Sequence, residues 1–168
     1  MSCCETSNQP KQPLSFNKPW LVNLVFWFTS KLFHSFYPKG SEKRHQQVMR
    51  LFQFCADRQH LMANSMYGHI LVFRGVTPWD KKQGVEYLKY AAQQGDVKAS
   101  YQLADLMMQQ AHGLNDDQSE VFSLLMVAAK GGHYLAEQQL SGILSSHPEL
   151  LDSLDSEDHV WLESLLGN

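Results

Sequence analysis

Hydrophobic residues recur every three to four positions along most of the chain, the spacing typical of amphipathic helices. Proline, glycine and clusters of polar residues separate these segments. The pattern predicts helices over residues 20–37, 46–54, 61–73, 80–95, 97–110, 117–132, 134–145, 149–154 and 156–166. The sequence therefore predicts an all-α fold.

Part of this pattern occurs twice. Residues 87–95 recur as residues 124–132, which lie 37 positions later, and a weaker copy precedes them at an offset of 36. A fixed period of roughly 20–50 residues is typical of solenoids, in which each repeat buries its apolar face only against its neighbours. We expect a short α-solenoid built from antiparallel helix pairs.

Each repeat carries signals for the ends of its helices. Asp80 and Asp117 occupy equivalent positions before an apolar helix, and each has a Gln or Glu three residues later. Both are therefore predicted N-caps. Gly95 and Gly132 follow the helices, where a backbone with positive φ costs least in glycine. The next helix begins almost at once, which predicts a tight helical hairpin.

Small residues lie on both sides of these turns. Ala92 and Ala99 in one repeat correspond to Ala129 and Ala136 in the next. A larger side chain would push the two backbones apart, so we expect all four alanines to be buried at a close helix crossing. Cys55 occupies an alanine position of the earlier copy and is predicted to be a small buried residue.

Residues 63–99 resemble the Sel1-like repeat, a relative of the tetratricopeptide repeat. The residues that carry the resemblance are Ala63, Tyr67-Gly68, Gly75-Val76, Asp80, Tyr87-Leu88-Lys89-Tyr90-Ala91-Ala92, Gly95 and Ala99. The next unit, 99–136, departs from the family pattern at Ala104, Met107 and Gly113-Leu114. The resemblance implies an adaptor in a protein complex, as in many bacterial family members, some of which act in envelope assembly, motility or exopolysaccharide secretion.

Residues 19–40 form the most apolar segment and lie outside the repeats. Lys31 and His34 interrupt the apolar run before it reaches the roughly 20 residues of a membrane span. No small-residue cleavage site of a secretory signal follows it. An amphipathic, aromatic-rich helix remains. It either packs on the repeats or on a partner, or lies on a membrane surface, with contacts from Trp20 to Tyr37.

Charge is unevenly distributed. The chain has a net charge of −3, yet residues 1–50 carry seven Lys/Arg and two acids, which gives +5, and residues 149–168 carry six acids and no Lys/Arg. The overall balance disfavours a nucleic-acid partner. We divide the chain into a disordered leader (1–18), the amphipathic helix (19–40), the repeat region (41–147) and C-terminal capping helices (148–168) with an acidic outer face.

The sequence contains little that indicates chemistry. Its eight histidines show no metal-ligand spacing with Cys or carboxylates, and no phosphate-binding loop or nucleophile motif is present. We expect no enzymatic activity, no catalytic residue, no metal and no cofactor.

The remaining function is binding. The first helices of stacked hairpins commonly line the partner-binding side. The candidate partner-binding residues are His69, Gln102, Asp105, Gln109 and Gln138 on those helices, and Trp20, Trp27 and Phe28 on the N-terminal helix. We expect a cytoplasmic adaptor or scaffold in a bacterial complex. The alternatives are a peripheral scaffold held at the inner face of the membrane by residues 20–37, and a regulatory subunit of an enzyme.

Overall fold

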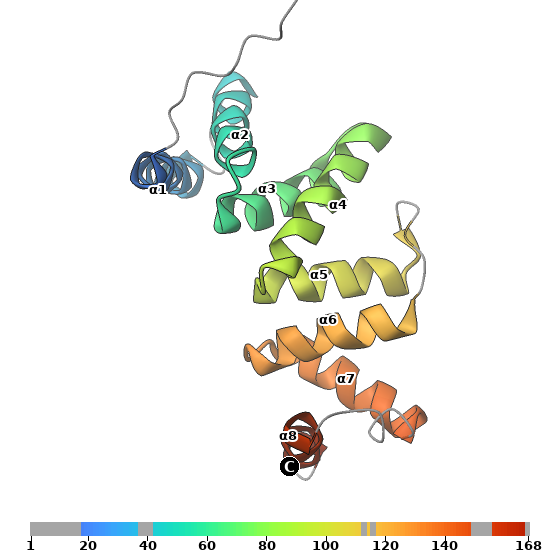
Figure 1. The fold of residues 1–168 in the computed structure, drawn as a ribbon. Helices are drawn as coiled ribbons and strands as arrows, with labels where there is room; N and C mark the ends of the chain where they lie inside the picture. Colours follow the sequence, from blue (N-terminus) through green and yellow to red (C-terminus); the bar gives the residue numbers. More distant parts are fainter. Residues whose placement is uncertain (1–17, 37–41, 112–113, 115–116, 149–155, 167–168) are drawn as a thin grey trace, which may run out of the picture.

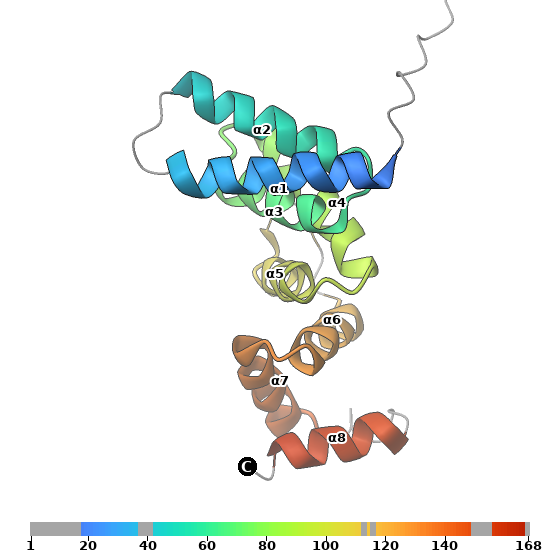
Figure 2. The same cartoon turned by 90° about the vertical axis from the view of Figure 1, so that its left-hand side faces the viewer.

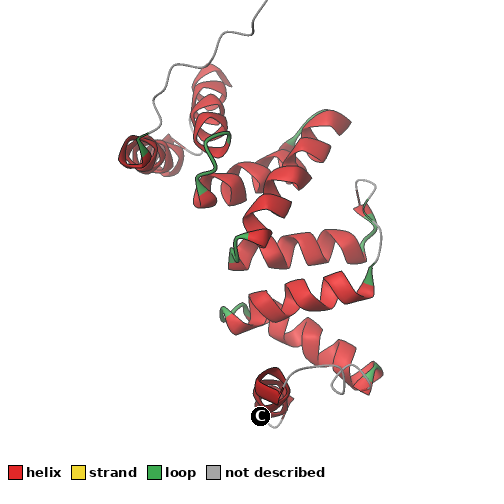
Figure 3. Cartoon of the chain, in the orientation of Figure 1, coloured by secondary structure: helices red, strands yellow, loops and turns green. Residues whose placement is uncertain are grey.

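A computed structural model describes residues 18–36, 42–111, 114, 117–148 and 156–166. These residues form helices and connecting turns and contain no strand, which confirms the all-α prediction (Figure 3). The helices are α1 (Pro19–Phe36), α2 (Glu42–Ala56), α3 (Leu61–Arg74), α4 (Pro78–Gln93), α5 (Val97–Met108), α6 (Gln118–Lys130), α7 (Tyr134–Ser146) and α8 (Ser156–Leu166).

The helices follow one another in chain order from one end of an elongated molecule to the other (Figure 1). Each helix packs against the next, and α3 also contacts α5. α1 and α2 lie at one end and α8 at the other, as the rotated view also shows (Figure 2).

Two predicted segments lie outside the described residues. These are most of the predicted leader, as residues 1–17, and the predicted helix 149–154. The same holds for Tyr37 at the end of the predicted N-terminal segment. The last predicted helix, 156–166, coincides with α8, whose Leu162 is fully buried.

One predicted N-cap is confirmed and the other is wrong. The Asp117 carboxylate accepts hydrogen bonds from the backbone amides of Ser119 and Glu120, as an N-cap should. The N-cap of α4 is Thr77, not Asp80. Thr77 Oγ1 accepts from Asp80 N, and Asp80 Oδ2 accepts from Thr77 N. This reciprocal capping box, with Pro78 in the first turn, starts the helix earlier than predicted.

The glycines that follow α4 and α6 behave as predicted. Gly95 has a φ of +81° and Gly132 a φ of +80°. The equivalent position after α2 holds Gln59, which adopts the same left-handed conformation with a φ of 60°. The three turns therefore share one backbone conformation, although the side chain of Gln59 makes it costly in the first of them.

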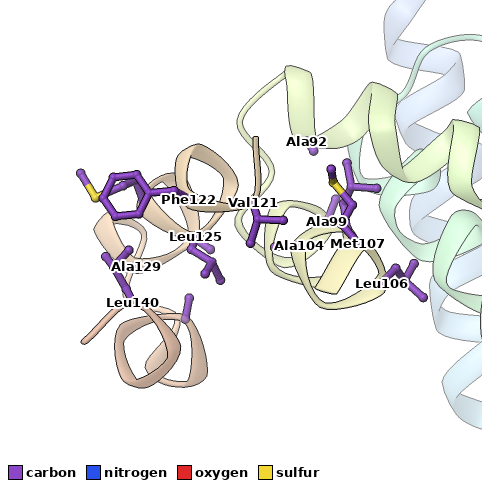
Figure 4. Packing of buried hydrophobic residues seen from close by; sticks show 14 of the residues in the cluster. Ala92, Ala99, Ala104, Leu106, Met107, Val121, Phe122, Leu125, Ala129 and Leu140 are labelled. Carbon is purple, nitrogen blue, oxygen red and sulfur yellow. The ribbon is translucent and has the colours of Figure 1, made fainter. Parts of the chain in front are cut away.

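The core consists of two clusters among the described residues. The smaller joins α1, α2 and α3, and the larger extends from the end of α3 to α8. Ala92, Ala99, Ala129 and Ala136 are all buried in the larger one, as predicted (Figure 4). Cys55 is a buried free thiol in the smaller one, also as predicted.

α3 and α4 approach each other unusually closely. A Cβ added to Gly68 would lie 2.9 Å from the carbonyl oxygen of Gly84, and one added to Gly84 would lie 2.8 Å from that of Gly68. The equivalent positions on α5 and α6 hold Ala104 and Val121, both buried. The α5–α6 crossing therefore accommodates side chains where the α3–α4 crossing has only backbone.

The buried face of α1 includes a polar residue. Phe28, one of the candidate partner-binding residues, is exposed, whereas its neighbour Thr29 is fully buried. The Thr29 hydroxyl donates to Val25 O at 2.7 Å, so its polar group is satisfied inside the helix. Val22 is also buried, while Phe26 contacts Phe52 edge to face.

Candidate partner-binding site

A pocket of about 350 Å³ lies where α1, α3 and α5 meet. It is lined by Phe33 of α1, by Ser65, Met66, His69, Ile70 and Arg74 of α3, and by Lys98 and Gln102 of α5. The structure thus brings together two of the candidate residues, His69 and Gln102, from helices separated by α4. We call this the α3–α5 pocket.

The α3–α5 pocket has an apolar part and a basic part. Phe33, Met66 and Ile70 provide the apolar surface. Arg74 and Lys98 are exposed cations, and none of the lining residues is acidic. The pocket therefore suits a ligand that combines an apolar group with negative charge.

The side-chain amide oxygen of Gln102 has no hydrogen-bond donor among the described residues. Its Oε1 atom is buried and makes no hydrogen bond in the described structure. A buried acceptor without a donor costs free energy, and a molecule in the pocket supplies that donor only after the Gln102 side chain turns its oxygen toward the pocket. The N–H of an extended peptide backbone is such a donor.

A hydrogen bond between α3 and α5 joins the two helices that form most of the pocket. Ser65 Oγ donates to Asp96 Oδ1 at 2.8 Å, and the same carboxylate oxygen accepts from Ala99 N at 2.8 Å. Asp96 is the N-cap of α5. One carboxylate thus both caps α5 and ties it to α3, which fixes the pocket wall.

The other candidates on the helices are not part of this pocket. Asp105 accepts a hydrogen bond from Gln109 at 2.8 Å, so these two residues pair one or two turns further along α5. Gln138 lies on α7 and donates to the Tyr134 hydroxyl at 2.7 Å. They form separate exposed polar groups.

The candidates on α1 form a second surface. Trp20, Trp27 and Phe28 are exposed, together with Leu24. They lie on the side of α1 that faces away from Val22, the residue that packs into the core. This surface is named the α1 outer face.

Sequence reasoning missed the two cations of the pocket and its aromatic residue. Arg74 ends α3, Lys98 starts α5, and Phe33 comes from a helix that lies outside the repeat. The 36-residue equivalence of α3 and α5 was the available signal, because equivalent helices of neighbouring repeats lie side by side.

The groups capable of chemistry in the smaller core cluster are buried or paired. Burial raises the pKa of the Cys55 thiol to about 11, and Arg58 opposes this shift. Cys55 Sγ lies 3.8 Å from Val22 O, to which its S–H donates. Burial also raises the pKa of Tyr87, whose hydroxyl donates to Asp57 at 2.6 Å. These groups stay protonated at neutral pH and serve the packing of α1 to α4.

Within the described residues, no three His, Cys, Asp or Glu side chains approach closely enough to hold a metal ion. None of the helices in that part of the chain has the length and apolar character required to span a bilayer.

Comparison with known proteins gave no similarity: the sequence matches no protein-family model, no curated protein and no solved structure.

Proposed function

We propose that this protein is a non-catalytic adaptor that holds a segment of a protein partner in the α3–α5 pocket. The observation that carries the proposal is the convergence of His69, Arg74, Lys98 and Gln102 around an apolar surface. An extended peptide with an apolar side chain and a nearby carboxylate fits this combination. The side chain would contact Met66, and the carboxylate would approach Lys98. A backbone N–H would donate to Gln102 Oε1 after the Gln102 side chain turns toward the pocket.

The proposed architecture is a short α-solenoid of antiparallel pairs similar to the Sel1-like repeat. α3 with α4 and α5 with α6 would be successive pairs. Three features support it: the repeated sequence, the packing of each helix on the next, and the positive φ at Gly95 and Gly132. The resemblance further favours a role in a bacterial complex.

Site-specific photo-crosslinking tests the proposal. A photoreactive amino acid replaces Gln102 in the full chain, expressed in its own host cells, and mass spectrometry identifies the adducts. We expect one predominant protein adduct. Adding Lys98→Glu should lower its yield about tenfold, the equivalent of one lost charge-assisted contact.

The control places the same photoreactive residue at Ser123, which is exposed on α6 away from the pocket. The adduct found at position 102 should be absent there. Equal adducts at both positions, or an adduct at 102 that Lys98→Glu does not change, would contradict a role for the pocket.

A further inference from the structure

The α1 outer face is a continuous apolar surface at the end of the molecule. Trp20, Leu24, Trp27 and Phe28 follow helical spacing and are between 53% and 61% exposed. In the rotated view α1 crosses in front of the neighbouring helices, so one side of this helix is not covered by them (Figure 2). A cluster of four large, exposed apolar side chains is typical of an interaction site.

The contacts of α1 show which position it occupies relative to the other helices. The Phe26 ring stacks on His60, the N-cap of α3, with ring centroids 4.3 Å apart. In the same way Ser65 of α3 contacts Asp96, the N-cap of α5. Tyr101 of α5 likewise stacks on His133, which precedes α7. These contacts place α1 beside the start of α3, as α3 lies beside the start of α5 and α5 beside the start of α7.

This equivalence identifies the counterparts of the exposed residues. The residue of α1 that makes the contact is Phe26. Leu24 lies two positions before it and Phe28 two positions after it, and each is 53% exposed. The counterparts are Ala63 and Tyr67 on α3, Ala99 and Leu103 on α5, and Ala136 and Leu140 on α7, all no more than 6% exposed. On those helices the preceding helix covers this face, whereas no helix of the described residues precedes α1.

The side chains on α1 argue against a closely packed helix as the missing cover. Where the other helices place alanine, α1 places Leu24, flanked by the bulky Trp20 and Trp27. Small residues allow helix backbones to approach, and large ones hold them apart. The α1 outer face is a ridge of large, projecting side chains. Such a ridge suits insertion into a deformable surface better than close packing against another helix.

Charge distinguishes among the remaining occupants. Lys18 and Lys31 are exposed at the two ends of the ridge, Lys43 and Arg50 are exposed on the adjacent α2, and α1 contains no acidic residue. A second copy would bring lysines next to lysines. An anionic surface would complement all of these charges.

We propose that the α1 outer face docks on the surface of an anionic lipid bilayer. Trp20 and Trp27 lie at the level of the headgroups, where their amphipathic rings are most favourable, and Leu24 and Phe28 reach the acyl boundary. Lys18 and Lys31 contact lipid phosphates. The α3–α5 pocket remains free for a protein partner, so this site adds a second binding activity independent of the proposed adaptor function.

Co-sedimentation with large vesicles tests the proposal on the full chain. Vesicles of phosphatidylcholine containing a third phosphatidylglycerol should bind the wild type, and pure phosphatidylcholine vesicles should bind it at least roughly tenfold more weakly. Trp20→Ala with Trp27→Ala should abolish most of the binding. Lys31→Glu should weaken it severalfold, and added salt should weaken it further.

Matched variants separate the α1 outer face from general effects. Trp79→Ala removes a tryptophan that is 72% exposed on α4, and Lys98→Glu makes the same charge change as Lys31→Glu in the pocket. Both should bind the anionic vesicles like the wild type, and circular dichroism should show that every variant is folded. Because Lys98→Glu is expected to impair the pocket, its normal vesicle binding distinguishes this proposal from the adaptor function.

Three outcomes would overturn the proposal. The wild type could fail to bind the anionic vesicles, the two kinds of vesicle could bind it equally, or the tryptophan pair could be as dispensable as Trp79. A photo-crosslink from position 27 to a protein in cells, combined with absent vesicle binding, would assign the face to a protein helix instead.

Discussion

The α3–α4 pair and the α5–α6 pair have equivalent sequences, but the backbones of α3 and α4 approach each other more closely. Gly68 and Gly84 face each other across the first crossing, with space for no added carbon. Ala104 and Val121 occupy these positions at the second crossing and are buried there. A repeat can therefore keep its helix order and its turns while one pair of positions sets how near the two backbones come.

The turns show the opposite relation, because they keep one backbone while the residues vary. Gly95 before α5 and Gln59 before α3 both have positive φ, at 81° and 60°. The N-cap that follows is Asp96 in one turn and His60 in the other. The closeness of two crossing helices thus differs between the pairs. The turns instead keep one backbone conformation, and a residue other than glycine adopts it at a cost in free energy.

The largest effect is expected when the residue of the second crossing is placed in the first. Gly84→Val puts a branched side chain against Gly68 O, Leu71 Cβ and Val72 N, each 2.8 Å from the added Cβ. Backbone cannot move aside as a flexible side chain can. The free energy of unfolding should fall by about 3 kcal/mol or more, measured by urea denaturation.

Gly142→Ala on α7 is the matched control for that substitution. A Cβ at Gly142 meets no atom within 4 Å, and alanine is the better helix former. This variant should be as stable as the wild type or gain up to about 1 kcal/mol. If Gly84→Val were equally harmless, the two crossings would not differ as described.

A smaller effect is expected from exchanging the turn residues. Gly95→Ala should lower the free energy of unfolding by about 1–2 kcal/mol, because alanine resists a positive φ. The cost is conformational, since no atom lies within 4 Å of the added Cβ. Gln59→Gly should do the reverse and raise stability by about 0.5–1 kcal/mol.

Thermal melts of these two variants and of Gly132→Ala check the comparison. Gly132 has a φ of +80° and an equally open surrounding, so its variant should lose as much stability as Gly95→Ala. A stabilised Gly95→Ala or a destabilised Gln59→Gly would show that the shared backbone conformation does not determine the cost.

The sequence predicted the helices well because the apolar spacing and the turn glycines act locally. It missed the start of α2 at Glu42, since the first four residues of this helix are polar and the apolar pattern begins only near Val48. It misplaced the start of α4 because the sequence offers two capping boxes, beginning at Thr77 and at Asp80. Only the backbone geometry selects Thr77.

The candidate site was predictable only in part. Assigning partner residues to the first helices of the repeats found His69 and Gln102, which share a pocket. Lys98 was not found, because no local pattern says which end of α5 lies beside α3. On α1, hydrophobicity alone could not place Thr29 in the core, since this polar residue is buried with its hydroxyl bonded to the helix backbone.

The smallest effect is expected at the N-cap that differs between the two turns. His60 Nδ1 accepts a hydrogen bond from Ala63 N at 3.2 Å, which requires an unprotonated nitrogen. Burial lowers the pKa of His60, so the unfolded chain binds more protons just below its ordinary pKa of about 6.5. This contribution to stability is complete above that pH and is lost as the pH falls toward the lower folded pKa.

His60→Asn keeps a capping acceptor that does not titrate, so its urea unfolding between about pH 5 and 8 should lose this part of the pH dependence. Superimposable profiles for the wild type and His60→Asn would show that the His60 cap is insensitive to protonation.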